Sequence, residues 1–276
     1  MDPFSIDAYS PKEIAGRIQQ LGVVKSKGDP LRVLALSLLA GAFIALGAAL
    51  FTVVTHDATG LAGGVLRLIG GVAFCLGLIL VVVAGAELFT GNNLIVMAYV
   101  DGQVSLKQLI NNWWLVYVGN FIGALGILLL IYFSGHWQTA NGAIGAHAVV
   151  IADAKVNLTW MEAFSRGILC NILVCLAVWL CYAGRSVTDK ILAVLFPITA
   201  FVALGFEHSV ANMFFIPAGL MAQSDALVAA ALTGPVSEQL TIGGFLWHNL
   251  LPVTLGNIVG GSVFVGLFYW FIYLRK

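Results

Sequence analysis

Charged residues are scarce in this sequence of 276 residues: aspartate, glutamate, lysine and arginine together make up only 9% of it. A typical soluble domain contains about 25%, so this chain cannot cover a water-facing surface with charge. The formal net charge is zero, which gives no reason to expect nucleic acid as a partner. Residues 1–30 are polar and lack the apolar core of a secretory signal peptide.

Metal-binding and catalytic patterns are also lacking. The four cysteines lie inside apolar blocks without any CxxC spacing, which is typical of small buried residues. His136, His147 and His248 are scattered along the chain. With no nucleophile triad and no cofactor-binding loop, the sequence predicts that the protein is not an enzyme and holds neither a metal nor a cofactor.

Apolar sequence is abundant instead, at 60% of residues. Blocks of about 20 apolar residues are long enough to cross a hydrocarbon core of about 30 Å. The second and fifth blocks are too long for one straight span and contain polar residues, so we expect both to be broken helices. The sequence thus predicts an all-α membrane protein with six transmembrane helices, at about 31–54, 67–99, 112–134, 160–182, 190–221 and 247–274.

The placement of basic residues predicts the orientation. Ten of the 13 lysines and arginines fall on the side of the N-terminus, and the last of them is Lys276. The other three are Arg67, Lys155 and Arg166. By the positive-inside rule, both termini are expected in the cytoplasm.

Residues 1–30 form a cytoplasmic N-terminal segment that precedes a pore domain at 31–276. Within it Ile14, Ile18 and Leu21 recur at helical spacing, which predicts an amphipathic helix. Three interpretations remain open: a helix lying on the lipid headgroups, a docking site for a cytoplasmic partner, and a lid on the pore.

Two pairs of segments indicate an internal repeat. Residues 85–92 and 205–212 share glycine, glutamate and asparagine at identical spacing. Residues 112–123 and 249–260 share asparagine, Gly-Asn and glycine, again at identical spacing, and both contain a GxxxG motif that lets helices approach closely.

The matches predict a duplicated three-helix unit, at about 31–134 and 160–274. Because three is odd, the two copies must have opposite orientations. This is the inverted-repeat architecture, in which broken helices meet near the midplane and form the solute site. We therefore expect a pore or carrier for a small solute.

Glu87, Glu207 and His208 lie inside apolar blocks, where a charge costs at least about 2.5–3.5 kcal/mol. We expect the two glutamates to accept hydrogen bonds from backbone amides freed at the helix breaks; direct contact with the solute is the alternative. His208 has no matching copy, because Leu88 takes the equivalent place. We therefore expect His208 to line the pore, and His208→Phe to change the direction or the pH dependence of flux.

Further candidates cluster near the two breaks. We expect neutral hydrogen-bonding groups, a mobile threonine, permissive glycines and aromatic rings that either form a dry constriction or are ordinary lipid-facing or packing residues. These are, in the same order, Asn171 and Asn212; Thr90; Gly85, Gly91 and Gly205; and Phe74, Phe201 and Phe206.

The segments Val82–Gly91 and Gly167–Ala177 resemble the two signature motifs of the formate/nitrite transporter family. Ser134–Gly142 and Gly205–Phe214 extend the resemblance toward the bacterial formate channels of that family, over nearly the whole chain. The resemblance implies an aquaporin-like protomer, a homopentamer with one pore in each protomer, and a location in the bacterial inner membrane among its lipids. It implies transport of formate or similar small monovalent anions, or their acids.

The resemblance also implies roles for single residues. His208 would be the central pore histidine, Thr90 would belong to a gating loop, and Lys155 and Asn171 would form a polar network. Phe74 and Phe201 would form one hydrophobic slit, and a second constriction would lie near Leu78, Leu88 and Val174. It implicates the N-terminal segment in gating and in contact with pyruvate formate-lyase.

The expected mechanism is passive or proton-coupled, pH-dependent transport. Lys155 would concentrate anions near the pore, and His208 would either meet the anion as a cation or give it a proton. Nitrite and hydrosulfide are alternative solutes. A neutral-solute facilitator is disfavoured because the twin Asn-Pro-Ala motifs are missing, and a purely structural role does not explain two polar breaks.

Overall fold

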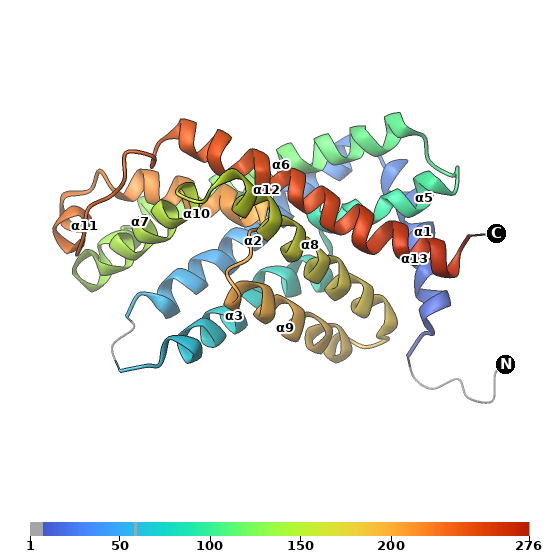
Figure 1. The fold of residues 1–276 in the computed structure, drawn as a ribbon, viewed down its shortest axis with the longest axis horizontal. Coiled ribbons are helices and arrows are strands. Elements are labelled where there is room, and N and C mark those ends of the chain that lie inside the picture. Colours follow the sequence, from blue (N-terminus) through green and yellow to red (C-terminus); the bar gives the residue numbers. More distant parts are fainter. Residues whose placement is uncertain (1–7, 58–59, 276) are drawn as a thin grey trace.

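The computed structural model describes residues 8–57 and 60–275. The first part of the predicted N-terminal segment, residues 1–7, and the counted Lys276 lie outside the described residues. All elements of the described part are helical, as predicted (Figure 1). They are α1 (Pro11–Ser26), α2 (Pro30–Thr55), α3 (Gly63–Leu80), η1 (Val81–Gly85), α4 (Phe89–Asn92), η2 (Asn93–Ile95), α5 (Val96–Val100), α6 (Leu106–Phe133), η3 (His136–Gly142), α7 (Ala143–Val156), α8 (Trp160–Ala183), α9 (Val187–Ala203), α10 (Ser209–Ala222), α11 (Ala226–Ala231), η4 (Gly244–Leu250), α12 (Leu251–Ile258), η5 (Val259–Leu267) and α13 (Phe268–Tyr273).

Several of these helices are long and apolar enough to cross a membrane. In the described part of the chain they are Pro30–Thr55, Gly63–Gly85, Leu106–Phe133, Trp160–Ala183 and Gly244–Tyr273. The predicted span at 190–221 is divided between α9 and α10, and α10 is a shorter apolar helix. The chain also leaves the helix at residues 86–88, inside the predicted second span.

Local sequence explains where the long helices begin. Side chains at the N-cap accept hydrogen bonds from backbone N–H groups that have no partner within the helix. Ser105 and Thr159 do so for α6 and α8, and each forms a capping box with the residue three positions later. Asp29 caps α2, and Pro30 follows at the first helical position.

The GxxxG motifs bring helix pairs into close contact. At Gly123 of α6, an added Cβ would overlap the backbone carbonyl of Leu38 in α2. At Gly260, beyond the end of α12, it would overlap the carbonyl of Ile168 in α8. The glycines therefore permit the backbone approach that the motifs predict.

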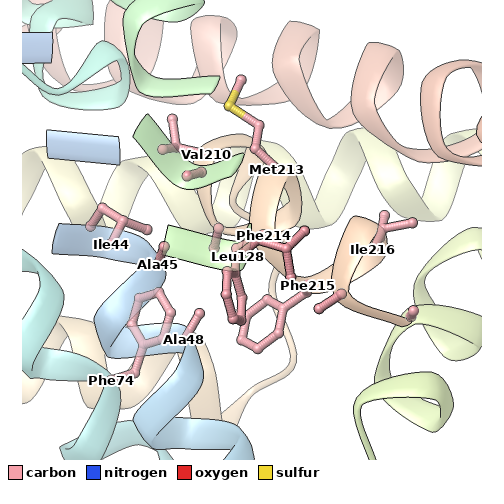
Figure 2. Packing of buried hydrophobic residues seen from close by; sticks show 14 of the residues in the cluster. Ile44, Ala45, Ala48, Phe74, Leu128, Val210, Met213, Phe214, Phe215 and Ile216 are labelled. Carbon is pink, nitrogen blue, oxygen red and sulfur yellow. The ribbon is translucent and has the colours of Figure 1, made fainter. Parts of the chain in front are cut away.

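Helix α10 lies at the centre of the protein, with almost every residue buried. Figure 2 shows residues of α2, α3 and α6 packed around it, with Phe74 near Phe215. The Phe74 ring stacks on Phe215, with ring centroids 6.3 Å apart, and lies edge-on to Phe201, with ring centroids 5.6 Å apart. Ile44, Ala45, Ala48 and Leu128 complete this side of the core. The core thus fixes the helix that begins directly after the second break.

Helix α1 packs against the rest of the protein through its apolar face. Ile14 and Ile18 are each only 4% exposed, and they pack in a cluster with Met97 and Trp179. Figure 1 shows α1 beside α5 and α13. The apolar face that predicted an amphipathic helix is therefore used inside the chain, and the interpretation as a helix lying on the headgroups is wrong for that face.

Helix α7 lies outside the predicted spans. Its 14 residues are too few to cross a membrane. Small residues let it pack closely on α10: a Cβ added at Gly219 would meet Ala152. The sequence pattern did not reveal this helix because Asp153 and Lys155 interrupt a short apolar run.

We predict that Gly123→Ala lowers the thermal unfolding midpoint of the detergent-solubilised protein. The added methyl group forces α2 and α6 apart, and overpacking of this kind costs about 1–3 kcal/mol. Gly126→Ala is the matched control on the same helix, because a Cβ there meets nothing within 4 Å. Equal midpoints for the two variants would contradict the close approach.

Candidate functional site

The two helix breaks have the same backbone conformation. Gly85 and Gly205 have φ angles of +83° and +71°, values that glycine adopts without strain. Each is followed two residues later by a glutamate, as the repeat predicted. Gly91, predicted as a third permissive position, lies inside α4, so the break does not depend on its backbone freedom.

Asparagines on neighbouring helices bind the freed backbone groups. Oδ1 of Asn120 accepts from the Phe89 N–H at 2.9 Å, and its Nδ2 donates to the Glu87 carbonyl at 2.9 Å. Asn257 does the same at the second break, with the Ser209 N–H at 2.9 Å and the Glu207 carbonyl at 3.0 Å. These hydrogen bonds replace those that each helix loses.

The glutamate side chains have a different partner from the one predicted. The Lys25 Nζ atom of α1 lies 3.0 Å from Glu87 Oε2 and donates to Asn92 Oδ1 at 2.9 Å. Asn92 donates to both Glu87 and Asn112. We call these four residues the Glu87 cluster. The prediction that Glu87 and Glu207 accept the freed amides is wrong, because asparagines take those amides and the carboxylates accept from side-chain donors.

A second cluster repeats this arrangement. Lys155 Nζ of α7 lies 2.8 Å from Glu207 Oε1. Asn212 donates to Glu207 at 2.7 Å and to Asn249 at 2.7 Å. Asn249 donates back to the Lys155 carbonyl at 3.0 Å. In this Glu207 cluster, Lys155 is an ion-pair partner and not the free cation that the expected mechanism requires.

His208 joins the two breaks. Its Nδ1 accepts from the Ala211 N–H at 3.1 Å, which makes His208 the N-cap of α10. An Nδ1 that accepts leaves the proton of a neutral imidazole on Nε2. Nε2 lies 3.0 Å from Thr90 Oγ1 across the break, so Nε2–H donates to the threonine. The imidazole also stacks on Phe201, with ring centroids 6.0 Å apart.

Asn171 holds the first break to the second half of the chain. Its Nδ2 donates to the Thr90 carbonyl at 3.2 Å, to Asn93 Oδ1 at 2.7 Å and to the Asn257 carbonyl at 2.7 Å. The side chain is fully buried. Asn171 thus fixes the backbone that presents the Thr90 hydroxyl.

Two cavities lie near the breaks. The first, which we call the α1 cavity, has a volume of about 370 Å³ and is lined by α1 residues together with Leu78, Glu87 and Leu88. The second, the α7 cavity, has a volume of about 250 Å³, and its wall includes the predicted Phe74, Phe201 and Phe206, Lys155, Asn212 and His208.

The barrier between the cavities is thin. Phe74 and Leu78 are one turn apart on α3, about 6 Å along the axis, yet they line different cavities. Both side chains are buried, as is Val174, which belongs to the core. His208 lines the α7 cavity, and its buried partner Thr90 stands in sequence between Leu88 and Gly91, which line the α1 cavity, so we infer that their hydrogen bond lies in the barrier.

Sequence reasoning missed the role of Lys25. A signal was available: Lys25 and Lys155 each stand four residues before the N-cap of the following long helix, which is Asp29 in one case and Thr159 in the other. The spacing extends the internal match to the lysines that pair with the glutamates.

Comparisons with known proteins agree on one family. The family model described as formate/nitrite transporter matches residues 12–271. The chain is 44% identical to the formate channel FocA of Escherichia coli strain K12 over 279 residues, covering 100% of this chain and 97% of that protein. It is 41% identical to the formate channel FocA of Haemophilus influenzae strain Rd over 272 residues, covering 95% and 93% of the two chains. A solved structure described as a pentameric formate channel with formate bound has a TM-score of 0.83 and 41% identity, covering 89% of this chain and 98% of that one.

We predict that Glu207→Gln destabilises the protein more than Glu87→Gln does. The glutamine keeps the shape but leaves a lysine without its counter-charge, which costs about 3–5 kcal/mol in a buried pair. The side chain of Glu207 is 5% exposed and that of Glu87 is 12% exposed, so solvent compensates the second change better. Thermal unfolding in detergent measures the order.

The double variant Lys155→Met with Glu207→Gln serves as the control. It removes both charges, and we expect it to be more stable than Glu207→Gln alone. A double variant less stable than the single one would show that the lysine contributes through something other than the ion pair.

Proposed function

The chain belongs to the formate/nitrite transporter family, and on that premise we propose that it transports formate across the membrane through a pore between the α1 cavity and the α7 cavity. The protein is a channel or transporter and not an enzyme. The full-length similarity to formate channels supports this solute. The observation that carries it in this chain is the buried Thr90–His208 hydrogen bond between the cavities, because it puts polar donors inside an apolar barrier.

Formate that crosses the apolar barrier needs hydrogen-bond donors there. An anion that loses its water in an apolar site pays a large desolvation cost unless hydrogen bonds replace the water. Phe74 and Phe201 supply the apolar wall. Beside this wall, Nε2–H of His208 donates to Thr90, and we propose that it thereby orients the Thr90 hydroxyl, which donates to formate during passage.

The hydrogen bonds of His208 favour a neutral imidazole during this step. A second proton would have to reside on Nδ1, which already accepts from the Ala211 N–H. Protonation would therefore break the N-cap of α10. We propose that His208 acts as a neutral hydrogen-bond donor and that any proton accompanying formate comes from another source. Because Nε2–H donates to Thr90, the hydroxyl hydrogen of Thr90 can be donated to a formate oxygen.

We also propose that the chain is an inverted repeat with an aquaporin-like protomer, in which α1 and α7 are matching first elements. The Glu87 and Glu207 clusters support this, because each joins a lysine–glutamate ion pair to an asparagine that donates to a second asparagine. A homopentamer in the bacterial inner membrane, with both termini and the α1 cavity on the cytoplasmic side, is supported by the pentameric relative and by the placement of basic residues. Contact between the N-terminal segment and pyruvate formate-lyase rests on the family resemblance.

A family that includes nitrite transporters makes nitrite a second candidate solute, and hydrosulfide is the third. The test is flux into proteoliposomes containing the purified protein, with formate, nitrite, hydrosulfide and glycerol compared across pH and with protein-free vesicles as control. We expect saturable formate flux above the control and no glycerol flux. Glycerol flux without anion or weak-acid flux would overturn the proposal.

We predict that Thr90→Val lowers formate flux by about 10- to 100-fold, while Thr90→Ser stays within a few-fold of the unchanged protein. Valine has the shape of threonine but no hydroxyl, and a hydrogen bond to a charged group contributes about 1.5–3 kcal/mol. Initial flux rates in proteoliposomes measure both variants. Equal loss in the two variants would contradict a role of the hydroxyl alone, and loss in Thr90→Ser alone would mean that the methyl group, and not the hydroxyl, matters.

We predict that His208→Asn retains the pH dependence of formate flux. Asparagine is a good N-cap and can donate a hydrogen bond, but it does not titrate. If His208 instead met formate as a cation or gave it a proton, this variant would lose the pH dependence. Flux measured across pH for both proteins decides between these roles.

A further inference from the structure

The α1 cavity and the α7 cavity are lined by matching parts of the internal repeat. Their walls share residues of the same type at matching positions, which are Lys25 and Lys155, Glu87 and Glu207, and Asn92 and Asn212. The backbone supports the match for α2 and α8, because the N–H groups of the two glutamates donate to the carbonyls of Leu36 and Arg166, at 3.2 and 3.3 Å. Differences between the two walls therefore show what distinguishes one cavity from the other.

Aromatic rings are the main difference. At several matching positions the α7 cavity has a phenylalanine where the α1 cavity has a smaller side chain. The phenylalanines are Phe51, Phe201, Phe206 and Phe215, and their matches are, in the same order, Cys181, Val81, Ala86 and Ile95. The α1 cavity is formed by the same scaffold without these rings, so the scaffold itself does not explain them.

The rings of the α7 cavity form a connected aromatic surface. Phe51 lies edge-on to Phe215, with ring centroids 5.6 Å apart, and Phe215 also stacks on Phe74. Phe74 in turn lies edge-on to Phe201. Edge-to-face and offset stacking contacts favour a further aromatic ring over an aliphatic group of similar size. The cavity volume of about 250 Å³ admits one ring, since about 150 Å³ is enough for benzene in an apolar cavity.

Arg166 adds a positive charge to this surface. It lines the α7 cavity, whereas the apolar Leu36 takes the matching place in the wall of the α1 cavity. Lys155 and Glu207 neutralise each other at 2.8 Å, and the ion pairs found within residues 8–57 and 60–275 do not include Arg166. A guanidinium group can bind two oxygens of one anionic group at once. The wall therefore matches a ligand with one ring and one negative charge.

We propose that the α7 cavity binds small aromatic monoanions, with the ring among the phenylalanines and the anionic group on Arg166, and that such a ligand blocks the passage of formate. The block rests on the proposed function, because the cavity lies on the proposed pore, whereas the binding does not. The α1 cavity binds these ligands much more weakly, since its wall lacks the rings. Inhibition by this class of compound therefore acts from one side of the membrane.

Benzenesulfonate is the probe, because it stays ionised and its charge keeps it from crossing lipid. Methanesulfonate has the same anionic group without a ring, and cyclohexanesulfonate has a ring of similar size that is not aromatic. Initial formate uptake is measured in membrane vesicles of both orientations, with each compound added outside. Isothermal titration calorimetry measures binding to the purified protein in detergent separately.

When formate enters from the α7 side, we expect benzenesulfonate to halve uptake at a concentration about tenfold lower than cyclohexanesulfonate does, because each aromatic pair adds to the contact made by apolar area alone. Methanesulfonate should require a still higher concentration. When formate enters from the α1 side, the same concentration of benzenesulfonate should leave uptake unchanged.

Two variants exchange wall residues for their counterparts in the α1 cavity. Phe206→Ala and Arg166→Leu should each raise the dissociation constant of benzenesulfonate by about tenfold, and raise its half-inhibitory concentration, relative to uninhibited uptake by the same variant, to the same extent. Phe164→Ala is the matched control, because Phe164 also belongs to α8 but stacks on Trp160 and is not among the residues that line the cavity. It should bind benzenesulfonate as the unchanged protein does. Thermal unfolding in detergent checks that each variant is folded.

The competing explanation is that the rings only narrow the passage. Four results would favour it and overturn the aromatic site: no heat of binding, equal inhibition by benzenesulfonate and cyclohexanesulfonate, equal inhibition from both sides, or unchanged binding in both wall variants. The first three are measured on the unchanged protein, so a variant that fails to fold does not prevent the decision. Failure of the proposed function looks different. In that case benzenesulfonate would still bind, but vesicles with the protein would carry no more formate than vesicles without it.

Discussion

The need to satisfy every backbone hydrogen bond inside a membrane governs this structure. Lipid offers no partner to an N–H or carbonyl group released from a helix. The chain nevertheless leaves the helix twice, and Asn120 and Asn257 bind a donor and an acceptor on the two sides of each break. Once these groups are satisfied, the breaks can present side chains such as Thr90 and His208 in the middle of the protein.

The charges of the glutamates beside the breaks are neutralised by lysines. A free carboxylate near the barrier would repel an anion, and an unpaired buried charge would be costly. Pairing with Lys25 and Lys155 removes the net charge at both clusters while keeping their hydrogen bonds. Each lysine comes from a short helix, so these ion pairs also tie α1 and α7 to the breaks. The short helices thereby become parts of the cavities.

The sequence predicted the parts of this design that have strong periodic or positional signals. Long apolar blocks indicated the helices, and the GxxxG motifs indicated close packing that Gly123 confirms. Such signals do not identify hydrogen-bond or ion-pair partners that lie far apart in the sequence. Nothing local at Glu87 says whether its carboxylate accepts from a backbone amide or from Lys25, which stands 62 residues earlier. Helix α7 was not predicted for a different reason: its residues are consecutive in the sequence, but the helix is too short and too polar to resemble a membrane span.

The differences between the two breaks explain how a nearly symmetric scaffold produces a specific site. At equivalent positions of the matched segments, Leu88 stands opposite His208, and Thr90 stands opposite Val210. Each break thus contributes one polar and one apolar side chain, and the two polar ones bond to each other. Leu88 begins α4 without a side-chain cap, whereas His208 caps α10 through Nδ1. A histidine at both positions would place two imidazoles in one narrow barrier. With one histidine and one threonine, the imidazole N–H donates to the threonine and leaves the hydroxyl hydrogen of Thr90 free to donate, while Leu88 and Val210 at the matching positions are apolar.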